Sequence, residues 1–309
     1  MRVIFFGTPA FAAPTLAALA ASQHEVVAVV TQPDRARGRG QKITHSPVKA
    51  LALANNFSVF QPDSLKSPEV LDQIRSVGAD IGVVAAYGKI LPQALLDIPP
   101  RGLINVHASL LPRWRGAAPI HRAIEAGDAE TGVTIMRVVF ALDAGAMLSK
   151  VAIPIEPDIT SVALEAQLAE AGSALLIQTL GRMASGPVAE EPQDDSLVTY
   201  AKKIERADGL IDWKRSAQHI HNQVRAMRPW PMASATIREQ RLIVRTSRMS
   251  SRTTDAEPGR VVGVSAEAIS VATGGGVLDL VEVQLESRKP QSAREFAGAF
   301  ALTTGERFA

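Results

Sequence analysis

The sequence predicts an α/β protein in two parts: a doubly wound, Rossmann-like N-terminal domain and a smaller C-terminal β-barrel of the OB-like type. Short, continuously apolar strand candidates alternate with helical segments through the first half of the chain, which is typical of a parallel sheet covered on both faces. Beyond residue 204, short strand candidates are separated by glycine and proline, as in a small barrel. We therefore expect one domain over 1–185, a linker over 186–203 and the barrel over 204–309.

The N-terminal domain begins with an apolar strand over residues 3–6 that ends at Gly7, followed by a helix over 10–21. Pro14 is compatible with this helix only in its first turn. The same stretch loosely resembles a signal peptide, but its apolar run is interrupted by Gly7, Pro9 and Pro14. We therefore favour a strand, a tight turn and a helix.

The other elements of this domain follow from β-branched runs and helical periodicity. Ser46 is a candidate N-cap, with Pro47 at the first helical position. The expected strands cover 26–30, 81–85, 103–107 and 133–139, and the expected helices cover 46–55, 68–77 and 160–184.

The chain changes character after residue 184. Residues 185–196 contain Gly186, Pro187 and Pro192 with several acidic residues and no apolar period, which indicates a linker. The elements expected beyond it are a helix over 216–227 and strands over 234–237, 242–246, 260–264, 268–272 and 277–283.

The composition excludes several kinds of chemistry. The chain has no cysteine, so disulfides, thiolate nucleophiles and cysteine-ligated zinc are excluded. No apolar run reaches the length of a membrane-spanning helix, and we expect a cytoplasmic protein without membrane contact. Residues 200–252 hold 12 basic and 4 acidic residues. This excess indicates either a polyanionic partner or a solvated basic face without a partner.

The most informative motif covers residues 105–119 and reads Asn-Val-His-Ala-Ser-Leu-Leu-Pro-Arg-Trp-Arg-Gly-Ala-Ala-Pro. It continues a buried strand, so Asn105 and His107 face the same side at the edge of the sheet. An amide donor beside an imidazole suits acyl chemistry, because the amide can hold a developing oxyanion and the imidazole can handle protons. Asp143 follows the strand over 133–139 and could approach His107, or it could simply begin a turn. His107, His121 and Asp143 do not form a recognised metal-ligand spacing, so we expect no metal.

Three further segments carry alternative interpretations. Residues 32–49 form a long polar loop with Arg35, Arg37, Arg39, Lys42 and Lys49, which indicates an anionic partner or an idle surface loop. Residues 228–232 frame Trp230 between two prolines, so that its ring packs into the barrel or serves as a platform for a base. Packing is the expected role of Trp230. Residues 7–12 lack the dinucleotide-binding glycines and predict only a tight turn.

Taken together, these segments resemble the folate-dependent formyltransferase family, over nearly the full chain. The wider family shares the asparagine, the histidine, Ser-Leu-Leu-Pro and the aspartate. The longer Pro-Arg-Trp-Arg-Gly-Ala-Ala-Pro run, the basic loop and the C-terminal part resemble the branch that acts on methionyl-tRNA. Ala108 stands where the family commonly has glycine, and Ala146 where an acid is frequent. The resemblance is carried by residues 7–9, 32–35, 38–40, 85–88, 105–119, 127–134, 142–143, 199–203, 211–213 and 229–231.

The resemblance implies transfer of a formyl group from 10-formyltetrahydrofolate to the amino group of methionine on initiator tRNA. Asn105 and protonated His107 would stabilise the oxyanion. Asp143 would keep His107 oriented and charged, and is a candidate to take the amine's proton through a water. The expected folate contacts are Ser109, Leu110, Leu111 and Pro112. The expected tRNA contacts are Arg35, Arg37, Arg39, Lys42, Lys202 and Lys203.

Two other functions remain open from the sequence. We expect the protein to be a monomer. A formyltransferase acting on a small amine, such as a glycinamide or an amino-sugar nucleotide, shares the N-terminal chemistry but leaves the basic segments unexplained. A non-catalytic RNA-binding protein explains the basic segments but leaves Asn105, His107 and Asp143 without a purpose.

Overall fold

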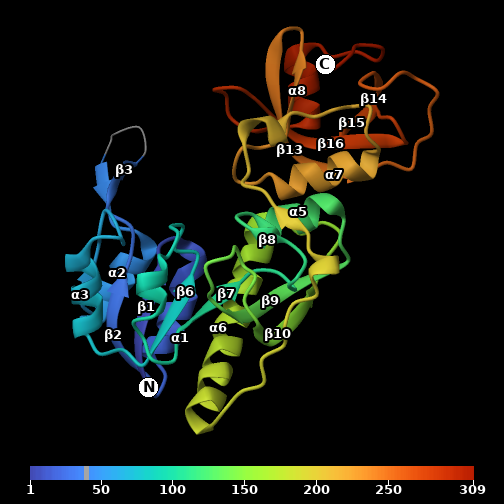
Figure 1. Ribbon diagram of the computed structural model, residues 1–309. Helices are drawn as coiled ribbons and strands as arrows, with labels where there is room; N and C mark the ends of the chain where they lie inside the picture. The colour runs from blue at the N-terminus through green and yellow to red at the C-terminus, as the bar shows by residue number, and fades with distance from the viewer. Residues whose placement is uncertain (38–41) are drawn as a thin grey trace. The chain divides into compact units, whose positions relative to one another are not determined.

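The computed structural model describes residues 1–37 and 42–309, and it divides into two compact units (Figure 1). Unit 1 comprises Met1–Pro119, Glu130–Pro154 and Glu165–Ala201. Unit 2 comprises Ile120–Ala129, Ile155–Leu164 and Lys202–Ala309. Arg39, one of the expected tRNA contacts, lies outside the described residues.

Unit 1 is built on a seven-stranded sheet, which confirms the expected α/β class. Its strands run in the order β10-β9-β7-β6-β1-β2-β5. The five strands from β7 to β5 are parallel, as in a Rossmann-like domain, whereas β9 and β10 are antiparallel to their neighbours. The bounds are β1 (Arg2–Gly7), β2 (Glu25–Val30), β5 (Val59–Phe60), β6 (Ile81–Ala85), β7 (Leu103–His107), β9 (Glu130–Arg137) and β10 (Met147–Pro154).

The antiparallel pair corrects the expectation of a further parallel strand at 133–139. A strand that is buried on both faces has the same apolar pattern whichever way it runs, so the pattern of β9 carries no direction. Strand β10 has no counterpart among the expected strands, and its exposed positions alternate with half-buried ones, as at the edge of an antiparallel sheet.

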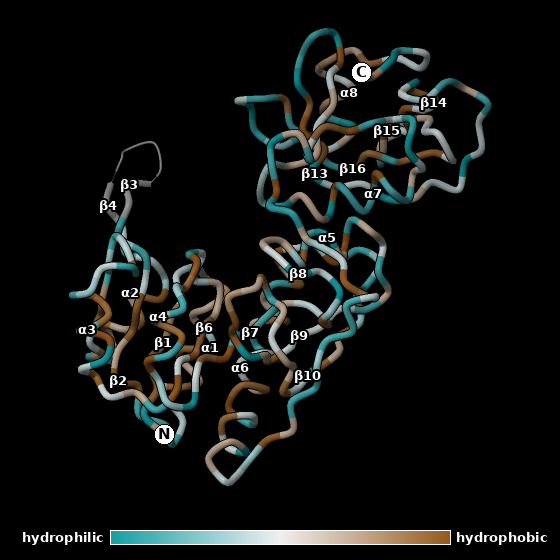
Figure 2. Tube along the Cα trace, viewed as in Figure 1, coloured by the Kyte–Doolittle hydropathy of each residue, from teal (hydrophilic) through white to brown (hydrophobic). Residues whose placement is uncertain are grey.

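The helices of unit 1 begin where the local signals place them. Ser46 caps α2 by accepting a hydrogen bond from the backbone N–H of Lys49, and Pro14 lies in the first turn of α1. Ile4 and Phe6 of β1 pack in one cluster with Ile74 of α3 and Leu95 of α4, and the central strands are predominantly hydrophobic (Figure 2). None of the described helices is both long and apolar enough to cross a membrane. The helices are α1 (Ala13–Ala20), α2 (Pro47–Ala54), α3 (Pro68–Ser76), α4 (Gln93–Leu96) and, from Glu165 onward, α6 (Ser161–Ser185), with short 3-10 turns at Ala10–Ala12 and Asp195–Leu197.

The stretch that follows α6 is tied to unit 1 along much of its length. Glu191 pairs with Met147 of β10 through two backbone hydrogen bonds of 2.8 and 2.9 Å. Strand β11 (Tyr200–Ala201) then pairs in parallel with β8 (Arg115–Gly116), inside the 105–119 motif. The expected linker over 186–203 thus contains regular backbone pairing. The division into two domains joined by this segment stays a prediction.

Unit 2 contains an antiparallel sheet in the order β12-β13-β16-β15-β14, with β17 paired to β16. The C-terminal segment bridges its two open edges, because Phe308 bonds to Gly259 beside β14 and Ala309 bonds to Thr236 of β12. The sheet is therefore a half-barrel completed by the C-terminus, in agreement with the expected class. The elements are α5 (Pro119–Ala126), α7 (Ala217–Ala226), β12 (Ser234–Ile237), β13 (Gln240–Met249), β14 (Val261–Val264), β15 (Ile269–Ala272), β16 (Val277–Leu285), β17 (Gln291–Ser292) and α8 (Ala293–Phe300).

The aromatic core of unit 2 corrects the packing role expected of Trp230. The side chain of Trp230 is 50% exposed. Trp213 is buried instead, with its ring 5.6 Å from that of Phe308. One indole fills the interior of this small half-barrel, and the ring between the two prolines faces solvent.

Candidate active site

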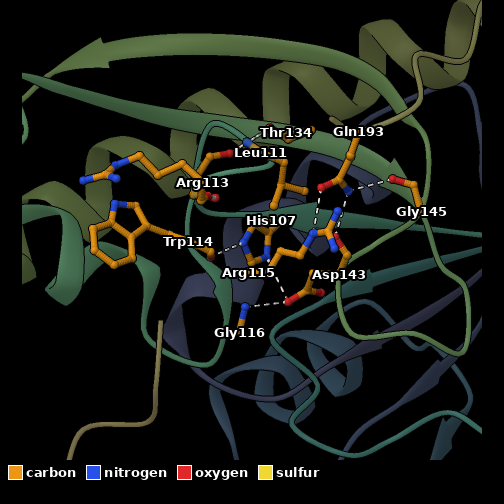
Figure 3. A network of polar contacts seen from close by, with 11 residues as sticks. His107, Leu111, Arg113, Trp114, Arg115, Gly116, Thr134, Asp143, Gly145 and Gln193 are labelled. Atoms are coloured by element: carbon orange, nitrogen blue, oxygen red, sulfur yellow. Dashed lines mark hydrogen bonds and ion pairs between the residues drawn. The ribbon is translucent and has the colours of Figure 1, made fainter. Parts of the chain in front are cut away.

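His107 ends strand β7 at the carboxyl edge of the parallel sheet, and its side chain is buried. Its Nε2 lies 3.0 Å from the carbonyl oxygen of Trp114 (Figure 3). A carbonyl only accepts hydrogen bonds, so Nε2 carries a hydrogen and donates it. The other ring nitrogen, Nδ1, faces Oδ2 of Asp143 at 3.7 Å. Nδ1 is therefore the ring atom at which a proton can be gained or released.

Asn105 lies two residues earlier on β7, and its side chain points to the same side of the sheet as that of His107. The residue is half-buried. Within residues 1–37 and 42–309, its side-chain amide has no hydrogen-bond partner. A partly desolvated amide without a protein partner is free to bind a substrate oxygen.

Asp143 comes to His107 from the connection between β9 and β10. Its Oδ2 accepts a hydrogen bond of 2.9 Å from the backbone N–H of Gly116. Its φ of 46° is in the left-handed region, which is uncommon for a residue other than glycine. The structure thus places Asp143 beside His107, and Asn105 shares the strand face of His107. Their catalytic roles stay a prediction.

The loop after His107 is held by side-chain to backbone hydrogen bonds. The Ser109 hydroxyl donates to the carbonyl of Arg113 at 2.6 Å. Thr134 of β9 donates to the carbonyl of Ser109 at 2.7 Å and accepts from the N–H of Leu111 at 3.1 Å. Because the Ser109 hydroxyl is committed to Arg113, it shapes the loop.

The four expected folate contacts differ in how much side-chain surface they leave accessible. Ser109 and Leu111 are buried, and Leu111 packs with Met136 and Met147. Leu110 and Pro112 are half-buried and retain accessible surface. Direct side-chain contact with a ligand is open to Leu110 and Pro112, whereas Ser109 and Leu111 act through the loop backbone.

A second group of motif residues meets at the carboxyl ends of β1, β2 and β6. The Gln32 side chain donates to the carbonyl of Tyr87 at 2.8 Å, and the Gln32 N–H donates to the Thr8 hydroxyl at 3.2 Å. Burial raises the pKa of Tyr87 to about 12, so its phenol is neutral at physiological pH. Strands β1 and β6 flank the point where the strand order reverses, which is the usual ligand crevice of such sheets.

The expected basic loop is in part a hairpin of β3 (Arg35–Arg37) and β4 (Lys42–Thr44), which projects from unit 1 (Figure 1). At its base, Asp34 accepts hydrogen bonds from Lys49 at 2.5 Å and from Gln61 at 3.1 Å. The Lys49 ammonium lowers the pKa of the Asp34 carboxyl below its usual range. Lys49 is thus committed to Asp34.

The basic excess of residues 200–252 is partly neutralised by acidic residues from the last part of the chain. On β13, Arg241, Arg245 and Arg248 pair with Glu286, Glu282 and Asp279 at 3.1, 3.4 and 3.4 Å. Lys202 and Lys203, by contrast, are exposed and have no carboxylate partner in the described part of the chain. A count along the sequence therefore overstates the free positive charge of this region.

The comparisons with known proteins define the class. A family model described as formyl transferase matches residues 1–180, and one described as formyl transferase, C-terminal domain, matches residues 203–301. The chain belongs to the formyl transferase family. It is 46% identical, over 98% of its own length and 97% of the relative's, to a methionyl-tRNA formyltransferase from Hydrogenovibrio crunogenus (strain DSM 25203 / XCL-2).

Solved structures share the fold at lower identity. WlaRD, a sugar 3N-formyl transferase, matches with a TM-score of 0.70 and 18% identity, over 94% of this chain and 99% of WlaRD. HypX from Aquifex aeolicus, in complex with tetrahydrofolic acid, matches with a TM-score of 0.66 and 16% identity. This match covers 99% of the present chain but only 48% of HypX.

Sequence reasoning missed Gln193, Thr134 and Thr199 as parts of the site. Gln193 donates to the backbone carbonyls of Asp143 and Gly145, and Thr199 accepts a 2.9 Å hydrogen bond from the N–H of Trp114. Thr134 and Thr199 lie inside matched motifs, which could have indicated them. Gln193 has no local signal, because it stands in a stretch rich in proline and acidic residues.

Proposed function

We propose that this formyltransferase transfers the formyl group of 10-formyltetrahydrofolate to the amino group of methionine on initiator tRNA. The observation that carries the proposal is the His107–Asp143 pair, with Asn105 on the same face of β7 as His107. The choice of tRNA rests on the relative that matches nearly the whole chain, which is a methionyl-tRNA formyltransferase. The exposed Lys202 and Lys203 are in keeping with a nucleic-acid partner.

In this mechanism, the free amine of methionine attacks the formyl carbon and a new carbon–nitrogen bond forms. The formyl oxygen gains negative charge, which the N–H of Asn105 and the protonated Nδ1 of His107 stabilise by hydrogen bonds. The Nδ1 position suits this role, because Nε2 is already bound to Trp114 and the 3.7 Å gap to Asp143 leaves the Nδ1 hydrogen available.

Asp143 completes the proton balance. Its carboxylate holds the imidazolium of His107 in place and takes the amine's proton through a water. That proton goes to the folate nitrogen as the bond from this nitrogen to the formyl carbon breaks. The chain needs no covalent intermediate and has no cysteine that could form one.

The folate would be held along the segment from Ser109 to Pro112, with Leu110 and Pro112 supplying the accessible apolar surface. The tRNA would meet the β3–β4 hairpin, with Arg35, Arg37, Arg39 and Lys42. It would also meet the lysine pair at 202–203. We place this activity in the cytoplasm and assign it to the monomer.

A competition between acceptors tests the proposal. The protein is incubated with 10-formyltetrahydrofolate and either methionyl initiator tRNA, glycinamide ribonucleotide or an amino-sugar nucleotide, and the products are identified by mass spectrometry. Formylation of methionine on the tRNA supports the proposal. Faster formylation of a small amine, or none of the tRNA, overturns it. Asn105→Ala serves as the control and is expected to lose roughly 100- to 1000-fold in turnover.

A further inference from the structure

Gln193 reaches the connection that carries Asp143 from fifty residues further along the chain. Its Nε2 donates two hydrogen bonds of 2.8 Å, one to the carbonyl of Asp143 and one to the carbonyl of Gly145 (Figure 3). Both N–H hydrogens of the Gln193 side-chain amide are thus donated to backbone carbonyls in the segment that carries the Asp143 carboxylate. The contact is made within unit 1.

Arg115 fixes the orientation of this amide. Its guanidinium is buried, and its Nε donates to Oε1 of Gln193 at 2.9 Å. A second nitrogen of the guanidinium donates to Asp195 at 3.2 Å. An amide turned the other way would set its oxygen against two carbonyls and its nitrogen against a cation. Arg115, itself part of the 105–119 motif, therefore presents the N–H groups of Gln193 to the Asp143 connection.

The Asp143 connection has little else to hold it in place. Val139, Phe140 and Leu142 just before Asp143 are exposed, so they anchor this connection only weakly. Asp143 adopts a left-handed conformation, which costs of the order of 1 kcal/mol or more for a residue other than glycine. The Gly116 N–H binds the carboxylate and Gln193 binds the backbone, and these contacts together oppose relaxation of the strained residue.

We propose that Gln193 is a positioning residue for the formyl transfer. It sets the position of the Asp143 carboxylate relative to Nδ1 of His107, and Arg115 orients it for this task. The inference rests on the proposed function, since it takes Asp143 as the carboxylate of the reaction. It adds a residue from the stretch between the two matched family regions, which end at 180 and begin at 203.

Unit 2 contains a matched control. Gln223 of α7 donates from its Nε2 to the carbonyls of Asp208 and Leu210, at 2.8 and 2.9 Å. It therefore binds two carbonyls spaced two residues apart, as Gln193 does, but on a connection without Asp143 or His107. Gln193→Leu and Gln223→Leu remove equivalent pairs of hydrogen bonds to backbone carbonyls, and Gln193→Leu also removes the acceptor of Arg115.

The experiment measures kcat and KM for both substrates in Gln193→Leu, Gln223→Leu, Asp143→Ala and the double variant of Gln193 and Asp143. We expect Gln193→Leu to lower kcat by roughly 10- to 100-fold with both KM values within about twofold. In the Asp143→Ala background the same change lowers kcat by less than about twofold, because its effect passes through Asp143. Gln223→Leu keeps kcat near that of the parent.

A second variant keeps the test valid if Gln193→Leu folds poorly. Gln193→Glu retains an oxygen for Arg115 but replaces the Nε2 donor, and it is expected to lower kcat in the same way. Parent-like kcat in both variants, or an equal loss in the Asp143→Ala background, overturns the positioning role while the proposed function stands. Parent-like turnover of Asp143→Ala overturns the positioning role together with the role assigned to Asp143, whereas the proposed function falls only if the parent does not formylate methionyl-tRNA.

Discussion

Replacing Gly145 by alanine is expected to displace the connection that carries Asp143. A Cβ built at Gly145 lies 2.7 Å from the carbonyl carbon of Arg137 and closer still to its oxygen, whereas real Cβ atoms essentially never approach within 3.0 Å. The obstacle is backbone of strand β9 and cannot turn away as a side chain could. The Gly145 segment must move instead, by roughly 1 Å, and a misplacement of that size at an active site costs about 100-fold in rate.

The structure supplies a control with the same steric conflict elsewhere. A Cβ at Gly274 lies 2.5 Å from the carbonyl carbon of Lys214, again a backbone obstacle, within unit 2. Both alanine variants should lose stability by about 1–3 kcal/mol, as overpacked sites do. Only Gly145→Ala should lose activity, since only its segment is held by Gln193 beside Asp143.

The assay combines thermal unfolding with single-turnover formylation under saturating 10-formyltetrahydrofolate and methionyl-tRNA. We expect a loss of about 100-fold in the single-turnover rate for Gly145→Ala and a loss below about threefold for Gly274→Ala, at similar Tm values. Equal rates for the two variants would show that the position of the Asp143 segment does not limit the chemistry.

The remaining predictions concern charge. Arg238, which donates to Glu306 at 2.7 Å, lowers the pKa of that carboxyl from 4.5 to about 2. The pair therefore stabilises the folded state above pH 4.5, and this contribution is lost as the pH falls toward 2. Glu306→Gln should lower the Tm at pH 7 by about 2 °C and leave the Tm unchanged near pH 2. Calorimetry across this pH range measures the difference in Tm. A difference in Tm that does not depend on pH would contradict the prediction. Alanine at both Lys202 and Lys203 should weaken tRNA binding and reduce the slope of log K against log salt concentration by about 1.4–1.8. Filter binding at several salt concentrations measures this slope. An unchanged slope would show that neither lysine contacts the tRNA.

The fold could be predicted where local chemistry decides it. Ser46 and Pro47 mark the start of α2, and the glycine at the end of β1 marks the first turn, because capping and turn geometry depend on neighbouring residues. The direction of β9 could not be predicted, since both sheet faces are covered and an apolar run is the same in either direction.

In the candidate site, too, local features could be predicted from the sequence and long-range contacts could not. Asn105 and His107 share a strand face by their spacing alone, so their proximity follows from the sequence. The hydrogen bonds of Gln193 to the Asp143 segment span about fifty residues and have no local pattern. The arginines of β13 are likewise neutralised by acids that follow them by 31 to 45 residues, which a local charge count omits. Contacts between residues far apart in the sequence depend on how the chain folds and leave no local pattern, so they could not be predicted.

In the proposed mechanism, Asn105 stabilises the charge that develops on the formyl oxygen. The most direct test is the single-turnover rate of Asn105→Ala on methionyl initiator tRNA, measured together with the affinity for that tRNA. We predict a rate lower by roughly 100- to 1000-fold with an affinity within about twofold of the parent. A parent-like rate, or a loss explained entirely by weaker tRNA binding, would contradict this role of Asn105.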